Sequence, residues 1–525
     1  MRQNVSDDHV PASSTRGAAS TFLTWLTRNA QRSPDKLFIH SIDQNTAITH
    51  AEMLRLCHQI GNYLARRGVR ANDRVALLSN NSLEHLAAYV GVMAYGATIC
   101  TIHVEMNTLH LPGVLRAVQP RLVLVEGGLE LDALEAQAPG EWMPLGNWGN
   151  GDTDGFLAEV SAQPEDLAFA PVNTLQDIAS IFYTSGTEAR PKGVACSFAE
   201  LYENTQPTAE AFGITANDRL LDFRSFNWMS AQVLSALGPL CRGATLLLAR
   251  KFSRSHFLEW VRDYRATIAA GNPTTLNMLT SQPVDIRRPQ VPDLRFITSS
   301  SAPLLKQDWL AFEEVYGIPV AQGYGSSETG WIAASNERTR RLGSVGKPLS
   351  YQKVAVVNEE GESLHPKAVG AIEVGRGPGA RYRYLGDDGT LRLSAKGRIR
   401  TGDMGYFDED GYLYVTGRTR DLIIRGGVNI APVEIDNIIC ELRDVAEAAA
   451  VGVPDRIYGE EVIAYVAAKP DTDLKAEDVL AYCRARLADA KVPKEIFFRP
   501  SLPKTDRGKL DRSALVADWT RTKSS

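Results

Sequence analysis

Short apolar runs alternate with helix-length amphipathic segments from about residue 21 to about residue 340. Strand-like runs occupy residues 73–79, 121–127, 244–250 and 294–300, and helical patterns lie between such runs. Repetition of strand, helix and strand predicts parallel βαβ units whose sheets are covered by helices on both faces. Ligands of such sheets bind at the carboxyl ends of the strands, so the functional residues are expected there.

One predicted helix shows both of its ends in the sequence. Asn81 and Glu84 have the spacing of a capping box before the pattern LEHLAAYVGVMAYG, in which Gly96 is a stop signal. These signals predict a helix that begins at Asn81, ends at Gly96 and lies between two buried strands.

The pattern changes after about residue 340. Short strand candidates joined by the turns NEEG and DEDG predict hairpins, and therefore a small antiparallel or barrel-like subdomain. From about residue 421 the order is helix, strand, strand, helix and strand, which predicts a small α+β domain with its own core. We expect an α/β protein with a flexible tail over 1–20, a large domain of parallel-rich sheets over 21–420 and a small mobile domain over 421–525.

The composition is that of a globular protein, with 44% apolar and 23% charged residues in 525. A net charge of −5 gives no argument for nucleic acid or an anionic membrane as the main partner. The six cysteines form no CxxC pair and are expected to be buried or incidental thiols of a reducing compartment. Residues 1–20 lack the apolar core of a secretory signal, and no apolar run reaches about 18 residues. These observations predict a cytoplasmic protein that acts away from membranes.

The segment with the most chemical information reads TSGTEARPKG from Thr184 to Gly193 and follows an apolar strand. Hydroxyls and backbone N–H groups beside a glycine can hold a polyphosphate, and Lys192 adds a positive charge. A Walker loop has glycine directly before its lysine, whereas Pro191 stands in that place here. Taken alone, the segment is compatible with a phosphate loop of another kind or with a surface turn.

This segment resembles the phosphate loop of the ATP-dependent adenylate-forming superfamily, which includes acyl-CoA synthetases, aryl-CoA ligases, peptide-synthetase adenylation domains and luciferases. Glu188 and Ala189 depart from the usual form, in which Thr and Gly are common. Further segments resemble the superfamily's motifs in the expected order: QGYGSSET from Gln322, RTGDMG from Arg400, GRTRDLI from Gly417 and PKTDRGKL from Pro503.

The resemblance implies a site for ATP and Mg²⁺. The nucleotide-binding residues that it implies are Thr184, Ser185, Gly186, Thr187, Lys192, Ser300, Ser301, Ala302, Tyr324, Gly325, Ser327, Asp403, Arg418 and Lys509. Among them, Tyr324 stacks on adenine and Asp403 accepts hydrogen bonds from the ribose hydroxyls. Glu328 and Thr184 hold Mg²⁺, which prefers oxygen ligands. Together with these two residues, the adenylation lysine Lys509 completes the predicted catalytic set.

The expected acid pocket departs from the superfamily. Many relatives carry Pro-x-x-His where this chain reads RSFNWM from Arg224, so a residue that cannot titrate, Asn227, replaces the histidine. Arg224 either binds a second acidic group of the substrate or forms a structural ion pair. Serines replace a common glycine pair in the segment SSSAP from Ser299. The predicted pocket residues are Arg224, Phe226, Asn227, Trp228, Ser299 and Trp331, and they favour a compact, flat or polar acid.

The last implied feature is the path of a thiol. Gly426 and Gly427 match a stretch that lines the thiol tunnel in thioester-forming members, and Asp421 matches the hinge between the domains. The sequence therefore predicts an acid:CoA ligase that uses ATP, Mg²⁺ and CoA, as a monomer or homodimer. The alternatives are an adenylating enzyme that passes the acyl group to an amine, another nucleophile or a carrier protein, and a nucleotide-binding regulator with an inactive site.

Overall fold

The computed structural model describes residues 21–104, 106, 110–128, 135, 138–148, 154–184, 191–375, 381–504 and 510–524. The predicted tail over residues 1–20 lies outside them. The chain divides into two compact units. Unit 1 consists of Met1–Leu37, Ile48–Tyr202 and Leu385–Thr390; unit 2 consists of Phe38–Ala47, Glu203–Tyr384 and Leu391–Ser525.

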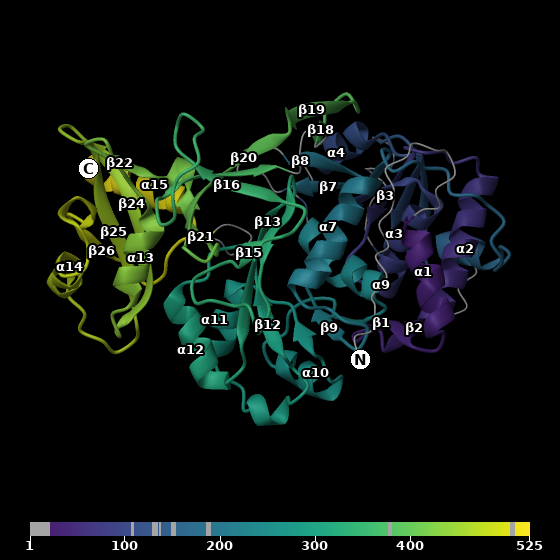
Figure 1. Ribbon diagram of the computed structural model, residues 1–525, viewed down its shortest axis with the longest axis horizontal. Coiled ribbons are helices and arrows are strands. Elements are labelled where there is room, and N and C mark those ends of the chain that lie inside the picture. The colour runs from purple at the N-terminus through teal and green to yellow at the C-terminus, as the bar shows by residue number, and fades with distance from the viewer. Residues whose placement is uncertain are drawn as a thin grey trace. The chain divides into compact units, whose positions relative to one another are not determined.

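Unit 1 is built on a sheet in which its strands follow the order β8-β7-β4-β3-β5-β6. Figure 1 labels β3, β7 and β8 of this sheet. The strands are β3 (Arg74–Leu78), β4 (Thr98–Ile102), β5 (Leu122–Val125), β6 (Glu141–Pro144), β7 (Ile178–Thr184) and β8 (Lys192–Ser197). All of these neighbours pair in parallel except β7 and β8, which are antiparallel. The runs predicted as strands at 73–79 and 121–127 fall on β3 and β5, so the predicted parallel sheet is confirmed.

Helices cover this sheet because their apolar faces pack on its buried side chains. The helices of this part of the chain are α1 (Thr21–Arg32), α2 (His50–Arg66), α3 (Leu83–Tyr95), α4 (Leu111–Val118), α6 (Phe156–Ser161) and α7 (Phe198–Ala211), the last of which continues into unit 2. In α4, Leu111 and Leu115 join a core cluster with Ala76 of β3 and Cys100 of β4.

Helix α3 is buried along its whole length. The Ser82 hydroxyl accepts a hydrogen bond from the backbone N–H of His85 at 3.0 Å, so Ser82 caps the helix. The prediction that Asn81 begins the helix is wrong by one residue, because the next side chain supplies the capping oxygen. Gly96 ends the helix with φ 101°, and its predicted role as a left-handed stop is confirmed.

Unit 2 contains a larger mixed sheet in the order β15-β14-β13-β12-β11-β9-β10-β1. Its strands are β1 (Leu37–Ser41), followed in the chain by β2 (Thr46–Thr49), and β9 (Arg219–Asp222), β10 (Thr245–Leu248), β11 (Ile268–Ala269), β12 (Phe296–Ser299), β13 (Val320–Ser326), β14 (Gly330–Ala334) and β15 (Lys347–Pro348). From β1 to β13 the pairing is parallel, and β14 and β15 are antiparallel additions. The predicted strands at 244–250 and 294–300 are therefore confirmed.

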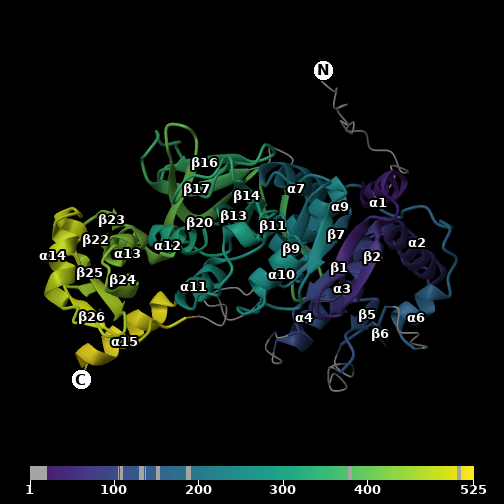
Figure 2. The same ribbon diagram turned by 90° about the horizontal axis from the view of Figure 1, so that it is seen from below.

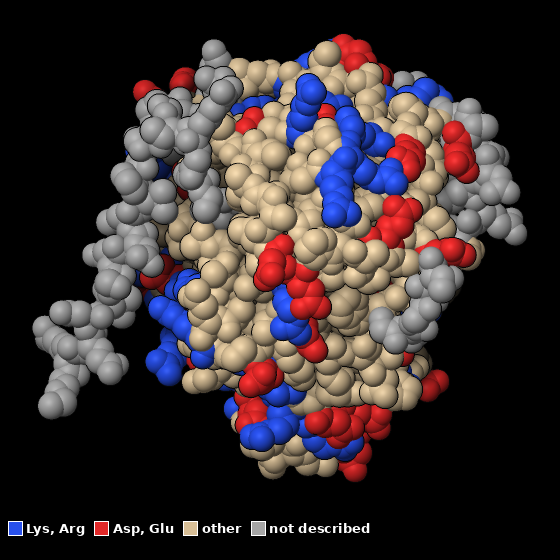
Figure 3. Space-filling model, turned by 90° about the vertical axis from the view of Figure 1, so that its right-hand side faces the viewer, with Lys and Arg blue, Asp and Glu red and all other residues tan. Residues whose placement is uncertain are grey.

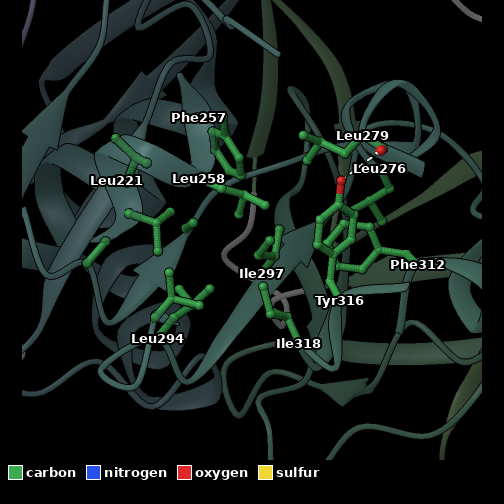
Figure 4. Packing of buried hydrophobic residues seen from close by; sticks show 14 of the residues in the cluster. Leu221, Phe257, Leu258, Leu276, Leu279, Leu294, Ile297, Phe312, Tyr316 and Ile318 are labelled. Atoms are coloured by element: carbon green, nitrogen blue, oxygen red, sulfur yellow. Dashed lines mark hydrogen bonds between the residues drawn. The ribbon is translucent and has the colours of Figure 1, made fainter. Parts of the chain in front are cut away.

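Three helices pack on one core of this sheet: α10 (Phe257–Asp263), α11 (Pro273–Ser281) and α12 (Lys306–Tyr316). Figure 4 shows their side chains meeting those of the strands: Phe257, Leu276 and Phe312 lie in one cluster with Leu221 and Ile297. The Tyr316 hydroxyl within this cluster donates to the backbone oxygen of Leu279 at 2.8 Å, so its buried polar atom is satisfied.

The predicted small subdomain is an antiparallel sheet in the order β16-β17-β20-β21. Its strands are β16 (Lys353–Val357), β17 (Gly370–Gly375), β20 (Arg398–Phe407) and β21 (Leu413–Arg418); β18 (Arg381–Leu385) and β19 (Leu391–Lys396) lie between β17 and β20 in the chain. The NEEG and DEDG segments form the predicted turns, because Asn358 and Asp408 each donate a backbone hydrogen bond across their loop.

A separate sheet follows residue 422, in the order β23-β22-β25-β24 with β26 parallel to β25 (Figure 2). Its elements are β22 (Ile423–Arg425), β23 (Val428–Ile430), α13 (Pro432–Cys440), β24 (Val445–Asp455), β25 (Gly459–Ala468), α14 (Ala476–Arg484), β26 (Ile496–Phe498) and α15 (Arg512–Ser524). Ala448 and Ala450 of β24 pack with α13 and α14, whereas Ala449 and Val451 pack with α15. Helices therefore cover both faces, and a small C-terminal domain follows the large sheets.

The six cysteines are all buried and without disulfide partners, which confirms the prediction of buried thiols. Basic and acidic residues lie close together on the face shown in Figure 3, between larger areas of uncharged surface. Oppositely charged side chains also form ion pairs in the structure; for example, Nη2 of Arg67 lies 3.2 Å from Oε2 of Glu159. None of the described helices is both long enough and apolar enough to cross a membrane.

Gly346, just before β15, gives a stability prediction. Its φ is +97°, and a Cβ at this position would lie 2.1 Å from the backbone oxygen of Ala334. We expect Gly346→Ala to cost about 3 kcal/mol, because the left-handed backbone and the clash add up. Gly411→Ala is the matched control: its φ is +78° and no atom lies within 4 Å of the added carbon. A thermal midpoint lowered equally by both substitutions would contradict the role of the clash.

Candidate active site

Two side chains of unit 2, those of Tyr324 and Arg418, meet at the carboxylate of Asp403. The register of β20 and β21 places Asp403 opposite Arg418, whose Nε lies 2.8 Å from Oδ1. Tyr324 of β13 donates its hydroxyl to Oδ2 at 2.5 Å. Asp403 is 6% exposed, so two donors fix a buried carboxylate. The structure thus brings together three residues that were predicted to bind the nucleotide.

The chemistry of this cluster suits a sugar diol. Burial, followed by the negative charge of Asp403, raises the pKa of Tyr324 well above its usual value, so the phenol stays a neutral donor. An ionised carboxylate has about four acceptor positions and can accept several hydrogen bonds at once. The buried Asp403 carboxylate is therefore a suitable group for accepting hydrogen bonds from the hydroxyls of a sugar.

Glu328 follows β13 and is partly buried. Its Oε1 accepts a hydrogen bond from the hydroxyl of Tyr384, on β18, at 3.2 Å. No cluster of three or more His, Cys, Asp or Glu residues that could hold a metal occurs among the described residues. A single carboxylate such as that of Glu328 can supply one oxygen ligand to a hard cation. Tyr384 was missed by the sequence analysis, and no motif in the strand RYRYL indicated it.

Arg224 lies beside Asp222, the last residue of β9. The Nη2 atom of Arg224 is 2.7 Å from Oδ2 of Asp222, and Nη1 donates to Oγ of Ser300 at 3.2 Å. Of the two roles expected for Arg224, receptor for a second acidic group or member of a structural ion pair, the structure contains the ion pair. Asp222 was missed, although an acidic residue two positions before an arginine on an extended segment is a usable signal.

Three serines follow in sequence at the end of β12. Ser299 is fully buried, and its Oγ has no hydrogen-bond partner among the described residues. Ser300 is 3% exposed, whereas Ser301 is exposed and has φ +73°. Left-handed backbone is unfavourable for a residue with a Cβ, by about 1–2 kcal/mol. Ala302, the next predicted nucleotide-binding residue, is partly buried.

The remaining pocket candidates lie in or near the core of unit 2. Asn227 is 3% exposed and its side-chain nitrogen donates to Oγ of Ser225 at 3.2 Å. Phe226 is fully buried, and Trp228 is partly buried. Trp331 packs edge-on against Phe212, with ring centroids 5.2 Å apart. The contact with Phe212 shows that Trp331 packs in the core, in addition to its predicted place in the acid pocket.

Most of the predicted catalytic and phosphate-binding residues belong to two loops, the phosphate loop after Thr184 and the loop that contains Lys509. The described residues include only the two ends of each loop. Thr184 ends β7 and pairs in register with Lys192, which is exposed at the start of β8. On either side of Lys509, Lys504 and Leu510 form an isolated antiparallel bridge. Ser185, Gly186, Thr187 and Lys509 themselves lie outside the described residues. Of the other nucleotide candidates, Gly325 is exposed and Ser327 is partly buried.

The predicted thiol and hinge residues flank β22. Gly426 and Gly427 form the exposed turn between β22 and β23, with φ +58° and +82°. The backbone N–H of Gly426 donates to the oxygen of Tyr458 at 2.8 Å. Asp421 ends a single 3-10 turn, η3 (Thr419–Asp421), directly before the C-terminal sheet. A glycine turn and a short irregular connection therefore stand where the thiol path and hinge were predicted.

Comparison with known proteins agrees with this arrangement. The family model "AMP-binding enzyme" matches residues 26–385, and the model "AMP-binding enzyme C-terminal domain" matches residues 434–509. An oxalate–CoA ligase of Arabidopsis thaliana is 31% identical, over 94% of this chain and 98% of its own length. An indoleacetate–CoA ligase of Aromatoleum aromaticum is 31% identical over the same shares. ATP-bound MatB from Rhodopseudomonas palustris matches with a TM-score of 0.82 and 26% identity, over 95% of this chain and 99% of that one.

The chain belongs to the AMP-binding enzyme family. Within that family it is an AMP-forming acid:CoA ligase, whose substrates are a carboxylic acid, ATP and CoA. The predicted fold and the predicted reaction are thereby confirmed.

Proposed function

We propose that this ligase joins a compact carboxylic acid to AMP at a site that includes Asp403 and Glu328, releases pyrophosphate, and then transfers the acyl group to the thiol of CoA. The observation that supports it most is the buried Asp403 carboxylate, which Tyr324 and Arg418 hold in place and which can accept hydrogen bonds from ribose hydroxyls. Glu328 follows Tyr324 in the same motif, QGYGSSET, and in this proposal it supplies a carboxylate oxygen to the bound cation.

Attack of a carboxylate on ATP brings anions together, so the site must screen charge. Bound Mg²⁺, held by Glu328 and Thr184 in this proposal, would supply positive charge to the phosphate oxygens. Lys509 would hold the carboxylate of the acid against the α-phosphate, with the remaining hydroxyls and Lys192 of the phosphate loop on the other phosphates. Each such group is expected to act by orientation and electrostatics, since no covalent enzyme intermediate is needed.

We propose a compact acid with a flat or polar side chain. Ser299, fully buried, occupies space that a glycine would leave open, and Trp331 and Phe226 fill the interior near their strands. Two relatives named for small acids, oxalate and indoleacetate, support this size class. In this proposal, these side chains take up volume that a long alkyl chain would need.

A screen of pyrophosphate release over aromatic, amino, dicarboxylic and fatty acids tests the function. We expect release with at least one compact acid, and AMP release that rises at least about tenfold when CoA is added to that acid. Equal AMP release with and without CoA would instead point to an amine, another nucleophile or a carrier protein as acceptor. No release with any acid would contradict the proposed reaction.

We further propose that the small domain begins at Asp421 and rotates about it between the two half-reactions. Asp421→Pro is expected to slow thioester formation from acyl-AMP at least about tenfold more than it slows ATP–pyrophosphate exchange, because proline removes the freedom of φ. Asp421→Ala, which removes the 3.5 Å contact with Arg420 but leaves φ free, is the control and should leave both rates near normal. Equal losses in both half-reactions of the proline variant would contradict the hinge.

A cytoplasmic location is part of the proposal. Six buried cysteines without disulfide bonds are typical of a protein in a reducing compartment.

A further inference from the structure

Arg224 is a buried cation whose charge is already balanced. Its side chain is 2% exposed and that of Asp222 is 0% exposed. The carboxylate accepts hydrogen bonds from Nε, Nη2 and the backbone N–H of Arg224, at 3.1, 2.7 and 2.8 Å. Two charges paired this closely in the interior behave as one neutral, rigidly oriented group. The pair is therefore a poor receptor for a second acidic group of a substrate.

The guanidinium also reaches the serine segment at the end of β12. Its Nη1 donates to Oγ of Ser300, a residue 76 positions further along the chain and 3% exposed. A hydroxyl oxygen that accepts one hydrogen bond can still donate its own hydrogen. Donation from a cation polarises that O–H bond and makes it a better donor. Within the described ranges, the Ser300 hydroxyl accepts this hydrogen bond and donates none.

Ser299 and Ser301, the two neighbours of Ser300, are each held in an energetically unfavourable state that a bound ligand would stabilise. The buried Oγ of Ser299 has no partner among the described residues, which is unfavourable by about 1–3 kcal/mol. Ser301 adopts φ +73°, where a residue with a Cβ is strained. Strained backbone and unsatisfied buried hydroxyls concentrate at sites that act on ligands. A molecule with several acceptor oxygens would satisfy this turn.

We propose that the Asp222–Arg224 pair is a positioning device for Ser300, whose hydroxyl donates to an oxygen of the acyl-adenylate as that molecule forms. Arg224 acts through Ser300 and does not touch the acid. The inference rests on the proposed function, since it takes the Ser300 segment as part of the adenylate site. In this proposal, Arg224 does not contribute to the selection between acids with one carboxylate and acids with two.

The test is a double-mutant cycle in ATP–pyrophosphate exchange, with the acid that gives the highest rate in the screen. S300A removes the donor and is expected to lower kcat about tenfold, the usual effect of losing one hydrogen bond to a charged group. R224K keeps the positive charge but loses the planar fork that reaches both partners, so about the same loss is expected. R224K/S300A should be no slower than the slower single variant. Losses that multiply in the double variant would overturn the proposal.

S299A is the matched control, because Ser299 is the adjacent buried serine and makes no contact with Arg224 among the described residues. The effects of S299A and R224K are expected to multiply. A purely structural Arg224 would lower the folded fraction and leave kcat per folded molecule unchanged, so rates are normalised by active-site titration. Unchanged kcat per active site in both R224K and S300A would also overturn the inference.

Two further readouts complete the experiment. The ratio of kcat/KM for malonate to that for acetate should stay within about twofold in R224K; a tenfold fall would make Arg224 a receptor for the second carboxylate. If R224K does not fold, D222N/R224Q replaces the ion pair with two neutral amide groups and enters the same cycle with S300A. A wild-type enzyme inactive with every acid rejects the proposed function, whereas an active one with multiplying losses rejects only this inference.

Discussion

Lys509→Ala is expected to reduce acid-dependent ATP–pyrophosphate exchange by at least about 10²–10³-fold, the usual cost of losing one preorganised charge at a reacting centre. An ammonium 4 Å from a phosphate oxygen contributes about 4 kcal/mol at an effective dielectric constant of 20, which agrees with that range. The loss should fall on kcat, because the lysine acts when the two anions meet. Thioester formation from added acyl-AMP should stay near the wild-type rate, since that step no longer needs the contact.

Lys504→Ala is the matched control for this prediction. Lys504 lies in the same motif, but its Nζ is 2.6 Å from Oε1 of Glu447. Its positive charge is therefore paired with a carboxylate of the small domain. We expect exchange within about threefold of the wild type in this variant. Near-normal exchange in Lys509→Ala, or an equal loss in both lysine variants, would remove Lys509 from the proposed mechanism.

The fold was predictable where burial imposes a simple pattern. Strands such as β3 and β12 are buried on both faces, so they read as continuous apolar runs bounded by helical segments. The C-terminal helix α15 was not predicted, because few of its residues are apolar. Its position depends on tertiary contacts: Leu515 packs on the sheet, and Arg512 pairs with the buried Asp436 of α13.

The sequence identified several residues of the candidate site, but it did not predict the contacts between them. Motif resemblance identified Tyr324, Asp403 and Arg418, but their meeting depends on the register of β20 and β21, which shifts at a bulge after Met404. The contact of Tyr384 with Glu328 joins residues 56 positions apart, and no sequence period connects them. Local patterns report burial and turns, whereas hydrogen bonds between distant strands are set by packing of the whole sheet.

Asp403→Asn is expected to raise the KM for ATP about 10²-fold in the exchange reaction. Asparagine keeps the size of the side chain, but it removes the negative charge that attracts both Arg418 and the ribose hydroxyls. Hydrogen bonds to a charged group contribute about 1.5–3 kcal/mol each, and loss of that charge weakens two of them in the proposed complex. The half-reaction with CoA, started from added acyl-AMP, should show a similar rise in the concentration of acyl-AMP needed.

A nucleotide without the two hydroxyls separates binding of the ribose from damage to the site. With wild-type enzyme, 2′,3′-dideoxy-ATP should show about the same rise in KM as ATP shows with Asp403→Asn. With Asp403→Asn, ATP and the dideoxy analogue should differ by less than about threefold, because the group that distinguishes them is gone. Tyr324→Phe removes only the donor to Oδ2 and should raise the KM for ATP about tenfold or less, with the preference for ATP retained. A full preference for ATP over the analogue in Asp403→Asn would show that the ribose is bound elsewhere.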